Sequence, residues 1–256
     1  MQPRISCKTD RLRRGLAHGI AKPMNLADRI IYIDAEAIVI DKPAGLPVDR
    51  PRAGGPSVSA MLHDLRLGFH RTPALLHRLD QDTSGCLVLA RNPQSRIRFQ
   101  AAFEQHRVEK LYLALLDGEV EGDEGVVDMA LGKVSTAEEG WRMVPDPAGK
   151  AARSPWRVIA RRGGRTLVGF APETGRTHQI RVHAASGLGV PIVGDPVYGK
   201  VPGGTGRTML LHSAQLTIPR EKKPAIVAAA PLPPNWGDWR EEWTPPAAEP
   251  VTIDVP

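Results

Sequence analysis

The residues best suited to chemistry in this chain stand together in the run His77-Arg78-Leu79-Asp80, which a Thr-Ser-Gly turn separates from an apolar stretch at 86–91. Polar groups clustered around one leucine gain little unless each has a partner, so the run indicates a working site. It places one carboxylate, that of Asp80, beside an expected strand. The alternative interpretation is an ion pair between Asp80 and Arg78 that only fastens the loop to the sheet.

Further motifs bear on that choice, and they lie far from the first run along the chain. They are Asp-Lys-Pro-Ala-Gly at 41–45, Lys-Leu-Tyr-Leu-Ala at 110–114, Thr-Gly-Arg-Thr-His-Gln-Ile-Arg-Val-His at 174–183, and Pro-Ile-Val-Gly-Asp at 191–195 followed by Tyr198-Gly199. With the run at 77–85 they resemble, in the same order, the motifs of RNA pseudouridine synthases of the RluA type. The resemblance extends from about Arg29 to about Pro219, and several motifs in order are far more specific than one.

The resemblance implies an α+β protein with the pseudouridine synthase fold, in which a mixed, largely antiparallel central sheet is flanked by helices and loops. Strand and helix signals that interleave without regular βαβ spacing predict the same class. The resemblance also implies an enzyme without cofactor or metal that detaches uracil from its ribose within RNA, rotates the base and reattaches it through carbon. The expected partner is a stem-loop of ribosomal or transfer RNA, and we expect a monomer.

Three residues are candidates for the catalytic step: Asp80, Tyr112 and Arg181. Breaking an N-glycosidic bond at neutral pH requires a group that stabilises positive charge on the sugar or activates the sugar for elimination, and a carboxylate can do either. By resemblance Asp80 is essential, as nucleophile at the anomeric carbon or as base toward the neighbouring ribose proton, and both routes stay open. Arg181 would pair with it and keep it ionised, whereas Tyr112 would stack on the target base and assist proton removal at carbon 5. The alternative for Arg181 is a charge on a helix surface, and the alternative for Tyr112 is an ordinary core residue.

The remaining candidates would bind the substrate. A uridine stacked in RNA cannot present its glycosidic bond to a carboxylate until it is flipped outward. Arg78 is a candidate wedge or phosphate contact, and His77 either fills the space left by the base or only holds its loop by a hydrogen bond. The other candidates for RNA contact are Lys110, Arg176, His178 and Leu211, the last as an apolar wall for which ordinary core burial competes.

Composition agrees with a polyanionic partner. The chain of 256 residues carries a formal net charge of +6 and has a sequence pI near 9.6, and Lys and Arg that neutralise phosphates drive nucleic-acid binding. Charge alone does not exclude an ordinary basic protein. Cys7 and Cys86 form neither a disulfide framework nor a zinc site, and no secretory signal or membrane-spanning stretch is recognisable, so we expect a cytoplasmic protein.

Hydrophobic patterning predicts the elements that must position these residues. Strand signals occupy 30–33, 37–40, 111–116, 156–160 and 166–170, and Cys86 lies in an expected buried strand. Short helices are expected at 57–65, capped by a serine, and from an Asn-Pro pair at 92–93 to about 107.

One more helix is expected to carry part of the site. Thr177 predicts its N-cap and Gly187 its end. His178 and Arg181 would lie near one side of this helix, because residues three apart are neighbours.

The two ends differ in composition from the segment between them. Residues 1–28 are basic without apolar periodicity, which predicts a mobile arm: a dispensable extension, an electrostatic RNA contact or an organellar transit peptide. This segment is too short for the extra RNA-binding module of many relatives. Residues 29–219 form the expected catalytic domain. The tail at 220–256, rich in Pro and Trp, is expected to pack in extended form along the body through its tryptophans, with a role at the substrate edge as the alternative.

Other enzyme classes lack the context they require. His-Arg-Leu-Asp is not the His-Arg-Asp of kinases, and no Asp-Phe-Gly run accompanies it. The glycine-rich segment 203–208 lacks a Gly-Lys-Ser/Thr ending and is expected to be a flexible loop, and His178 and His183 do not have the spacing of a helical zinc pair. A non-catalytic RNA-binding protein that retains the fold is the remaining alternative, and its RNA affinity would not depend on Asp80.

Overall fold

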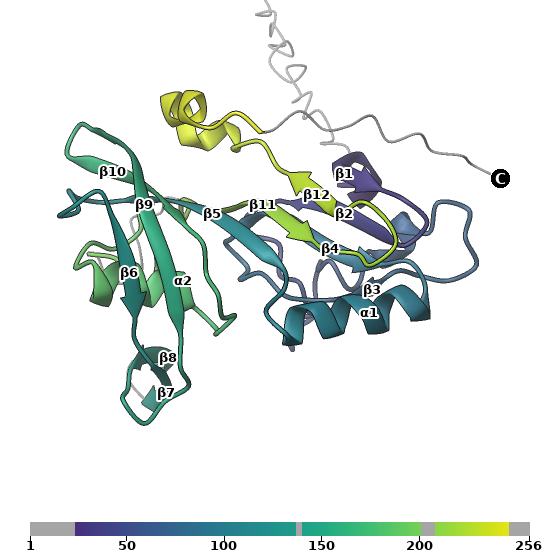
Figure 1. The fold of residues 1–256 in the computed structure, drawn as a ribbon, viewed down its shortest axis with the longest axis horizontal. Coiled ribbons are helices and arrows are strands. Elements are labelled where there is room, and N and C mark those ends of the chain that lie inside the picture. Colours follow the sequence, from purple (N-terminus) through teal and green to yellow (C-terminus); the bar gives the residue numbers. More distant parts are fainter. Residues whose placement is uncertain (1–23, 137–139, 201–207, 246–256) are drawn as a thin grey trace, which may run out of the picture.

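The computed structural model describes residues 24–136, 140–200 and 208–245, and a single large sheet runs across this part of the chain (Figure 1). The main path of the sheet has the order β1-β2-β4-β11-β5-β10-β9-β6, while β3 pairs with β4 and β12 with β11. The strands are β1 (Ile30–Ile33), β2 (Ala37–Lys42), β3 (Ala74–Leu75), β4 (Ser84–Ala90), β5 (Glu109–Leu116), β6 (Glu124–Asp128), β9 (Arg153–Arg162), β10 (Arg165–Phe170), β11 (Leu211–Ile218) and β12 (Ile226–Ala229).

The sheet is mixed because one of its described strand pairs is parallel. β11 runs parallel to β4, with His212 opposite Ser84 and Ser213 opposite Gly85. The other described pairs of this sheet are antiparallel. The predicted α+β class with a mixed, largely antiparallel sheet is therefore confirmed, and so are the strand signals at 30–33, 37–40, 111–116, 156–160 and 166–170.

Strand β4 lies at the centre of one half of the sheet and is buried on both faces. All seven of its residues are buried, which accounts for its continuous run of small and apolar residues. Because neighbouring side chains point to opposite faces, Cys86 and Val88 join one apolar cluster and Leu87 and Leu89 another. Helix α1 (Pro93–Glu104) covers the first cluster through Phe99 and Ala102, and it lies along this half of the sheet in Figure 1.

Helix α1 begins where the sequence predicts and ends three residues early. Asn92 caps it reciprocally with Ser95, and Pro93 occupies the first turn. The predicted end near residue 107 is wrong, because Gln105 is already the C-cap and His106 has a φ of 55°, a left-handed conformation that a helix cannot continue.

The prediction of a helix at 57–65 is also wrong. Only Leu62–Leu65 form a short 3₁₀ helix. The preceding backbone pairs with another segment instead, since the amides of Val58 and Ser59 each donate at 2.9 Å, to the carbonyls of Pro47 and Val48 respectively. Ser57 caps only a turn, accepting from the amide of Ala60 at 3.2 Å.

The described part of the C-terminal tail, residues 220–245, packs on the body as predicted, but not in extended form throughout. Strand β12 extends the sheet, and Pro234–Glu242 form 3₁₀ turns that are kinked at Gly237. Trp236 is 3% exposed and packs with Trp239 and Trp243 against the core around Leu115. The aromatic packing was predictable, whereas the turn geometry was not.

Parts of the expected arm and of the expected loop lie outside the described residues, namely 1–23 and 201–207. Within the last part of the expected arm, Leu26 is fully buried at the start of a 3₁₀ helix (Leu26–Arg29). Asn25 caps that helix by accepting from the amide of Ala27 at 2.9 Å.

Strands β7 (Leu131–Thr136) and β8 (Gly140–Pro145) form a separate antiparallel pair outside the main sheet. The sequence did not predict this hairpin. It projects at the lower left of Figure 1, beyond the ends of β6 and β9.

Gly85 provides a test of the central parallel pair. It has a φ of +102°, and an added Cβ would meet the Ser213 carbonyl oxygen at 2.2 Å. Gly85→Ala is therefore expected to lower the free energy of unfolding by about 3 kcal/mol or more, measured by urea denaturation. Gly164→Ala is the matched control, because Gly164 also has a positive φ of +69° but nothing within 4 Å. An equal loss in both variants would contradict the close approach of β4 and β11.

Candidate active site

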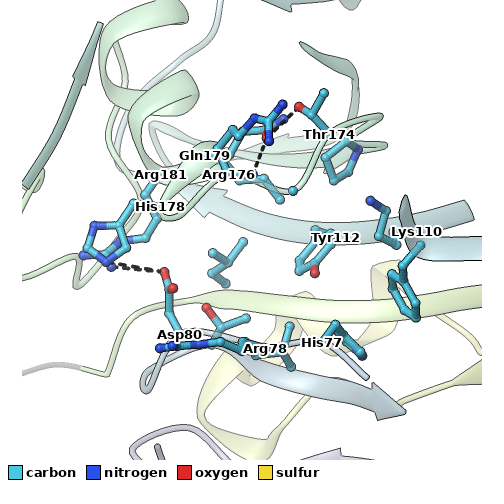
Figure 2. Close-up of a pocket in the computed structure, with 17 residues that line it drawn as sticks. His77, Arg78, Asp80, Lys110, Tyr112, Thr174, Arg176, His178, Gln179 and Arg181 are labelled. Atoms are coloured by element: carbon cyan, nitrogen blue, oxygen red, sulfur yellow. Dashed lines mark hydrogen bonds and ion pairs between the residues drawn. The ribbon is translucent and has the colours of Figure 1, made fainter. Parts of the chain in front are cut away.

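A pocket of about 150 Å³ opens between the loop before β4, strand β5, strand β11 and the short helix α2 (Gln179–Val182) (Figure 2). The structure brings all nine predicted site residues to its walls from separate segments of the chain. They are His77, Arg78, Asp80, Lys110, Tyr112, Arg176, His178, Arg181 and Leu211.

The motif at 41–45 packs against the loop that carries Asp80 and holds it through Lys42. The ammonium of Lys42, which is fully buried, donates to the carbonyls of Pro43, Leu46 and Gln81 at 2.8–2.9 Å. Burial lowers the pKa of Lys42 to about 8, although the negative charges of Asp82 and Asp80 act to raise it. The Lys-Pro-Ala-Gly turn thereby fixes the backbone beside the candidate carboxylate.

Arg181 joins two carboxylates, one buried and one open to the pocket. Its Nε and Nη2 donate to the two oxygens of Asp195 at 2.7 and 2.8 Å, and its Nη1 donates to Asp80 Oδ2 at 3.2 Å. The side chain of Asp195 is 0% exposed and that of Arg181 6%, whereas the side chain of Asp80 is 26% exposed. Of this group, Asp80 is therefore the one that a substrate can reach.

The charges of this group support one another. Burial alone would lower the pKa of Arg181, but the hydrogen bonds and charge of Asp195, with those of Asp80, raise it overall. Burial would raise the pKa of Asp195, yet its hydrogen bonds to Arg181 and to the amides of Tyr198 and Val197 hold it below the usual range. The site therefore contains a permanent cation next to Asp80.

His178 lies beside Asp80 and is oriented by Tyr198. The tyrosine hydroxyl accepts from the amide of Met143 at 3.0 Å and lies 2.9 Å from His178 Nδ1, so its own proton is free to point toward that nitrogen. On the other side of the ring, Nε2 of His178 lies 3.8 Å from Asp80 Oδ2. Burial lowers the pKa of His178, with Asp80 opposing and Arg181 reinforcing that shift, and a neutral ring results.

His178 reaches this position in a way the sequence did not predict. The predicted N-cap at Thr177 is wrong: the helix begins at Gln179, and His178 is the N-cap residue with a φ of 55°. The helix has no side-chain cap. The side chain of Gln179 instead holds the preceding loop, because its Oε1 accepts from the amide of Arg176 and the hydroxyl of Thr174, at 2.9 and 2.7 Å. After Val182 the chain widens into a π turn that ends at Gly187, which is the predicted end.

Tyr112, Leu211 and Lys110 line the wall between the two halves of the sheet. Burial raises the pKa of the Tyr112 phenol to about 12, so its hydroxyl stays protonated at neutral pH. Leu211 lines the pocket, and with 3% of its surface exposed it also packs in the core, the competing interpretation of this residue. Burial lowers the pKa of the Lys110 ammonium.

The other three predicted residues surround the pocket mouth. Arg78 is 76% exposed and pairs with Asp49 at 2.7 Å, so its partner is not Asp80. His77 holds its loop, because its Nε2 accepts from the amide of Val88 at 3.0 Å and its ring stacks on Phe103. Arg176 donates from Nε to the carbonyl of Ala151 at 3.0 Å.

Asp195 and Tyr198 are the residues that the sequence reasoning did not assign. Both lie in the motifs at 191–195 and 198–199, which were noted without a role for either side chain. The signal was a carboxylate placed shortly after the arginine motif, and a buried arginine needs such a counterion.

The chain matches the family model described as RNA pseudouridylate synthase over residues 36–186. It belongs to this family. The resemblance to synthases of the RluA type and the predicted isomerase class are therefore confirmed.

Two curated relatives illustrate the similarity. An uncharacterized RNA pseudouridine synthase of Zymomonas mobilis is 52% identical over 83% of this chain and 97% of its own length. The ribosomal large subunit pseudouridine synthase D of Nitrosomonas europaea is 41% identical over 67% of this chain, which spans only 50% of that relative.

Solved structures agree in fold. Human RNA pseudouridylate synthase domain containing 4 gives a TM-score of 0.68 at 27% identity, covering 81% of this chain and 90% of that one. Human RNA pseudouridylate synthase domain containing 1 gives 0.67 at 28% identity, covering 87% and 90%. The pseudouridine synthase fold predicted from the sequence is thereby confirmed.

Two kinds of feature are absent from the described residues, 24–136, 140–200 and 208–245. No group of three or more His, Cys, Asp or Glu side chains there is arranged to hold a metal ion. Within the same part of the chain, no helix has the length and apolar character to cross a membrane.

The buried pair in this synthase predicts a large effect of Asp195→Asn. Removing this buried partner leaves Arg181 with only the longer contact to Asp80 at 3.2 Å, so the free energy of unfolding should fall by about 3 kcal/mol, measured by urea denaturation. Asp123→Asn is the control, because Asp123 is 86% exposed and pairs with Arg161 on the surface. If the two variants were equally stable, the Asp195–Arg181 pair would not be structurally important.

The buried His77 ring predicts that the folded protein loses stability in acid. Burial, reinforced by the nearby charge of Lys110, lowers the pKa of His77 to about 4. In the unfolded chain this histidine binds a proton near pH 6.5, whereas in the folded chain it stays neutral down to about pH 4. The free energy of unfolding therefore falls as the pH drops from about 6.5 to about 4. In His77→Gln the unfolding temperature should fall less steeply over this range.

His63→Gln is the control for that experiment, because the His63 side chain is 71% exposed. It should keep the wild-type pH dependence. Identical slopes for the wild type and His77→Gln would show that His77 does not remain neutral in the folded protein.

Proposed function

We propose that this protein converts specific uridines of large-subunit ribosomal RNA to pseudouridine, with Asp80 as the catalytic carboxylate. The observation that carries the proposal is the open carboxylate of Asp80, paired at 3.2 Å with an arginine whose other nitrogens are held by buried Asp195. The names of several relatives favour ribosomal RNA over transfer RNA, which the sequence left open. The chain spans about half the length of these relatives, so the target itself is part of the proposal.

Two reaction routes can begin from the Asp80 carboxylate. In one, a carboxylate oxygen attacks C1′, the N1–C1′ bond breaks, uracil leaves with the electron pair, and C5 of the rotated base later displaces the carboxylate. In the other, Asp80 takes the C2′ proton, the N1–C1′ bond breaks to give a glycal, and C5 then adds to C1′ while the proton returns to C2′. In both, the proton on C5 leaves and N1 gains one.

The other pocket residues have distinct proposed tasks. Arg181 fixes the position of the Asp80 carboxylate through the contact at 3.2 Å. We assign Tyr112 to stacking on the target base rather than to proton removal, because a phenol with a raised pKa remains protonated at neutral pH. Leu211 supplies an apolar wall, and His178 is placed to form a hydrogen bond with the substrate through Nε2.

Three basic side chains that line the pocket complete the proposal. Arg78, Lys110 and Arg176 would neutralise RNA phosphates, and Arg78 can exchange its surface carboxylate partner for a phosphate at little cost. We propose that the reaction needs no cofactor or metal, and that a cytoplasmic monomer performs it. A non-catalytic RNA-binding protein with the same fold is the alternative.

The decisive test is a pseudouridine map of ribosomal and other cellular RNA in cells that lack the gene and receive either the wild type or Asp80→Asn. We expect at least one uridine whose modification is lost in the deletion and restored by the wild type only. With purified protein and that RNA, Asp80→Asn should lower the rate by at least about a thousandfold, because the reacting carboxylate is gone.

Asp82→Asn is the matched control, since Asp82 lies in the same loop but does not line the pocket. Its modification rate should stay within a few-fold of wild type. Restoration of the lost uridine by Asp80→Asn would support the non-catalytic alternative and overturn the proposal.

A further inference from the structure

The β7–β8 hairpin presents one face toward the active site. In its register Lys133 lies opposite Met143 and Ser135 opposite Trp141, and because side chains alternate, these four residues share a face. Met143 packs with the small core of Leu131, Ala152 and Val182, and its amide donates to Tyr198. The same face therefore carries Trp141 and Lys133 to the side of the pocket.

Trp141 continues the wall of the pocket outward. Its ring centre lies 5.0 Å from that of His178, with 30° between the ring planes. His178 lines the pocket and lies 3.8 Å from Asp80. Yet Trp141 is 48% exposed, so a large aromatic surface stays in contact with solvent directly beside the pocket.

A cation accompanies this ring. The ammonium of Lys133 lies 5.2 Å from the centre of the Trp141 ring, and its flexible four-carbon stem allows it to move to a nearby phosphate. An exposed aromatic ring next to a cation is the combination by which proteins bind single-stranded RNA, with a base on the ring and the phosphate on the cation.

Packing of the hairpin does not explain this exposure. The hairpin is already attached through Met143, its core contacts and the hydrogen bond to Tyr198. If Trp141 served only that attachment, burial of its ring would be expected, because an exposed tryptophan forgoes most of its hydrophobic stabilisation.

We propose that Trp141 and Lys133 form a stacking platform for a nucleotide next to the target uridine, with the base on the indole ring and its phosphate at the ammonium. This inference rests on the proposed function. When a uridine is flipped out, its neighbours lose a stacking partner, and an indole at the pocket rim replaces part of that contact. The platform thereby lowers the cost of opening the RNA.

The first test measures binding without turnover. The probe is a short fluorescein-labelled single-stranded RNA with one uridine between two adenines, and all variants carry Asp80→Asn. Trp141→Ala should weaken binding by about 5- to 150-fold, the range found when a base–aromatic stack is removed. Trp141→Phe should recover much of that loss.

Val134→Ala is the matched control, because Val134 is exposed on the opposite face of the same hairpin. It should bind the RNA as tightly as the Asp80→Asn parent. Equal affinity of the Trp141→Ala variant and its parent would overturn the inference.

The second test locates the contact. The measurements are repeated with RNA in which one adenine, on either side of the uridine, is replaced by an abasic nucleotide. At the position that stacks on Trp141, Trp141→Ala should cost little further affinity, because the base is already absent. Additive losses at both positions would show that Trp141 does not contact a flanking base.

Lys133→Ala should reduce the slope of log affinity against log salt by about one, as expected for the loss of one phosphate contact. An unchanged slope would remove Lys133 from the platform. These binding measurements do not depend on pseudouridine formation, so their failure is distinct from failure of the pseudouridine map. A positive map with no effect of Trp141→Ala would refute the platform alone.

Discussion

The buried guanidinium of Arg181 lies between two carboxylates, and the arrangement of the pocket depends on it. Two of its nitrogens are held by Asp195, which also accepts from the amides of Val197 and Tyr198. A bidentate buried pair tolerates little displacement, so the third nitrogen has a defined position for Asp80. Asp80 then needs no buried environment of its own and stays open to the pocket.

The same interaction organises the second layer of the site. Arg181 lies over the ring of Tyr198, at 5.1 Å from its centre, and the hydroxyl of that ring orients His178 and accepts from the hairpin backbone. One tyrosine thus links the helix, the hairpin and the loop after Asp195. The hairpin that carries Trp141 is tied to His178 by two consecutive hydrogen bonds through the Tyr198 hydroxyl.

The sheet provides the rigidity on which this depends. The loop that carries Asp80 leads into β4, which is buried on both faces and pairs with β11 through the tight approach at Gly85. Lys42 donates to three backbone carbonyls beside this loop and holds its backbone. A polar site on a loop is precise here because its backbone is held at both ends.

Much of this protein was determined by short-range information in the sequence. Runs such as that of β4 and the capping box of α1 predicted single elements, because each depends on residues near one another in the chain. The resemblance carried by the motifs and their order implied the class, the family and the nine pocket residues. The tertiary structure decided what depends on distant partners. The helix expected at 57–65 is lost to backbone pairing with 47–48, and Arg78 pairs with Asp49 rather than with Asp80. Asp195 becomes the counterion of Arg181 only when the fold brings them together. A residue's partner, and therefore its role, is a property of the fold, since the same carboxylate is a surface charge or a buried anchor according to what packs over it.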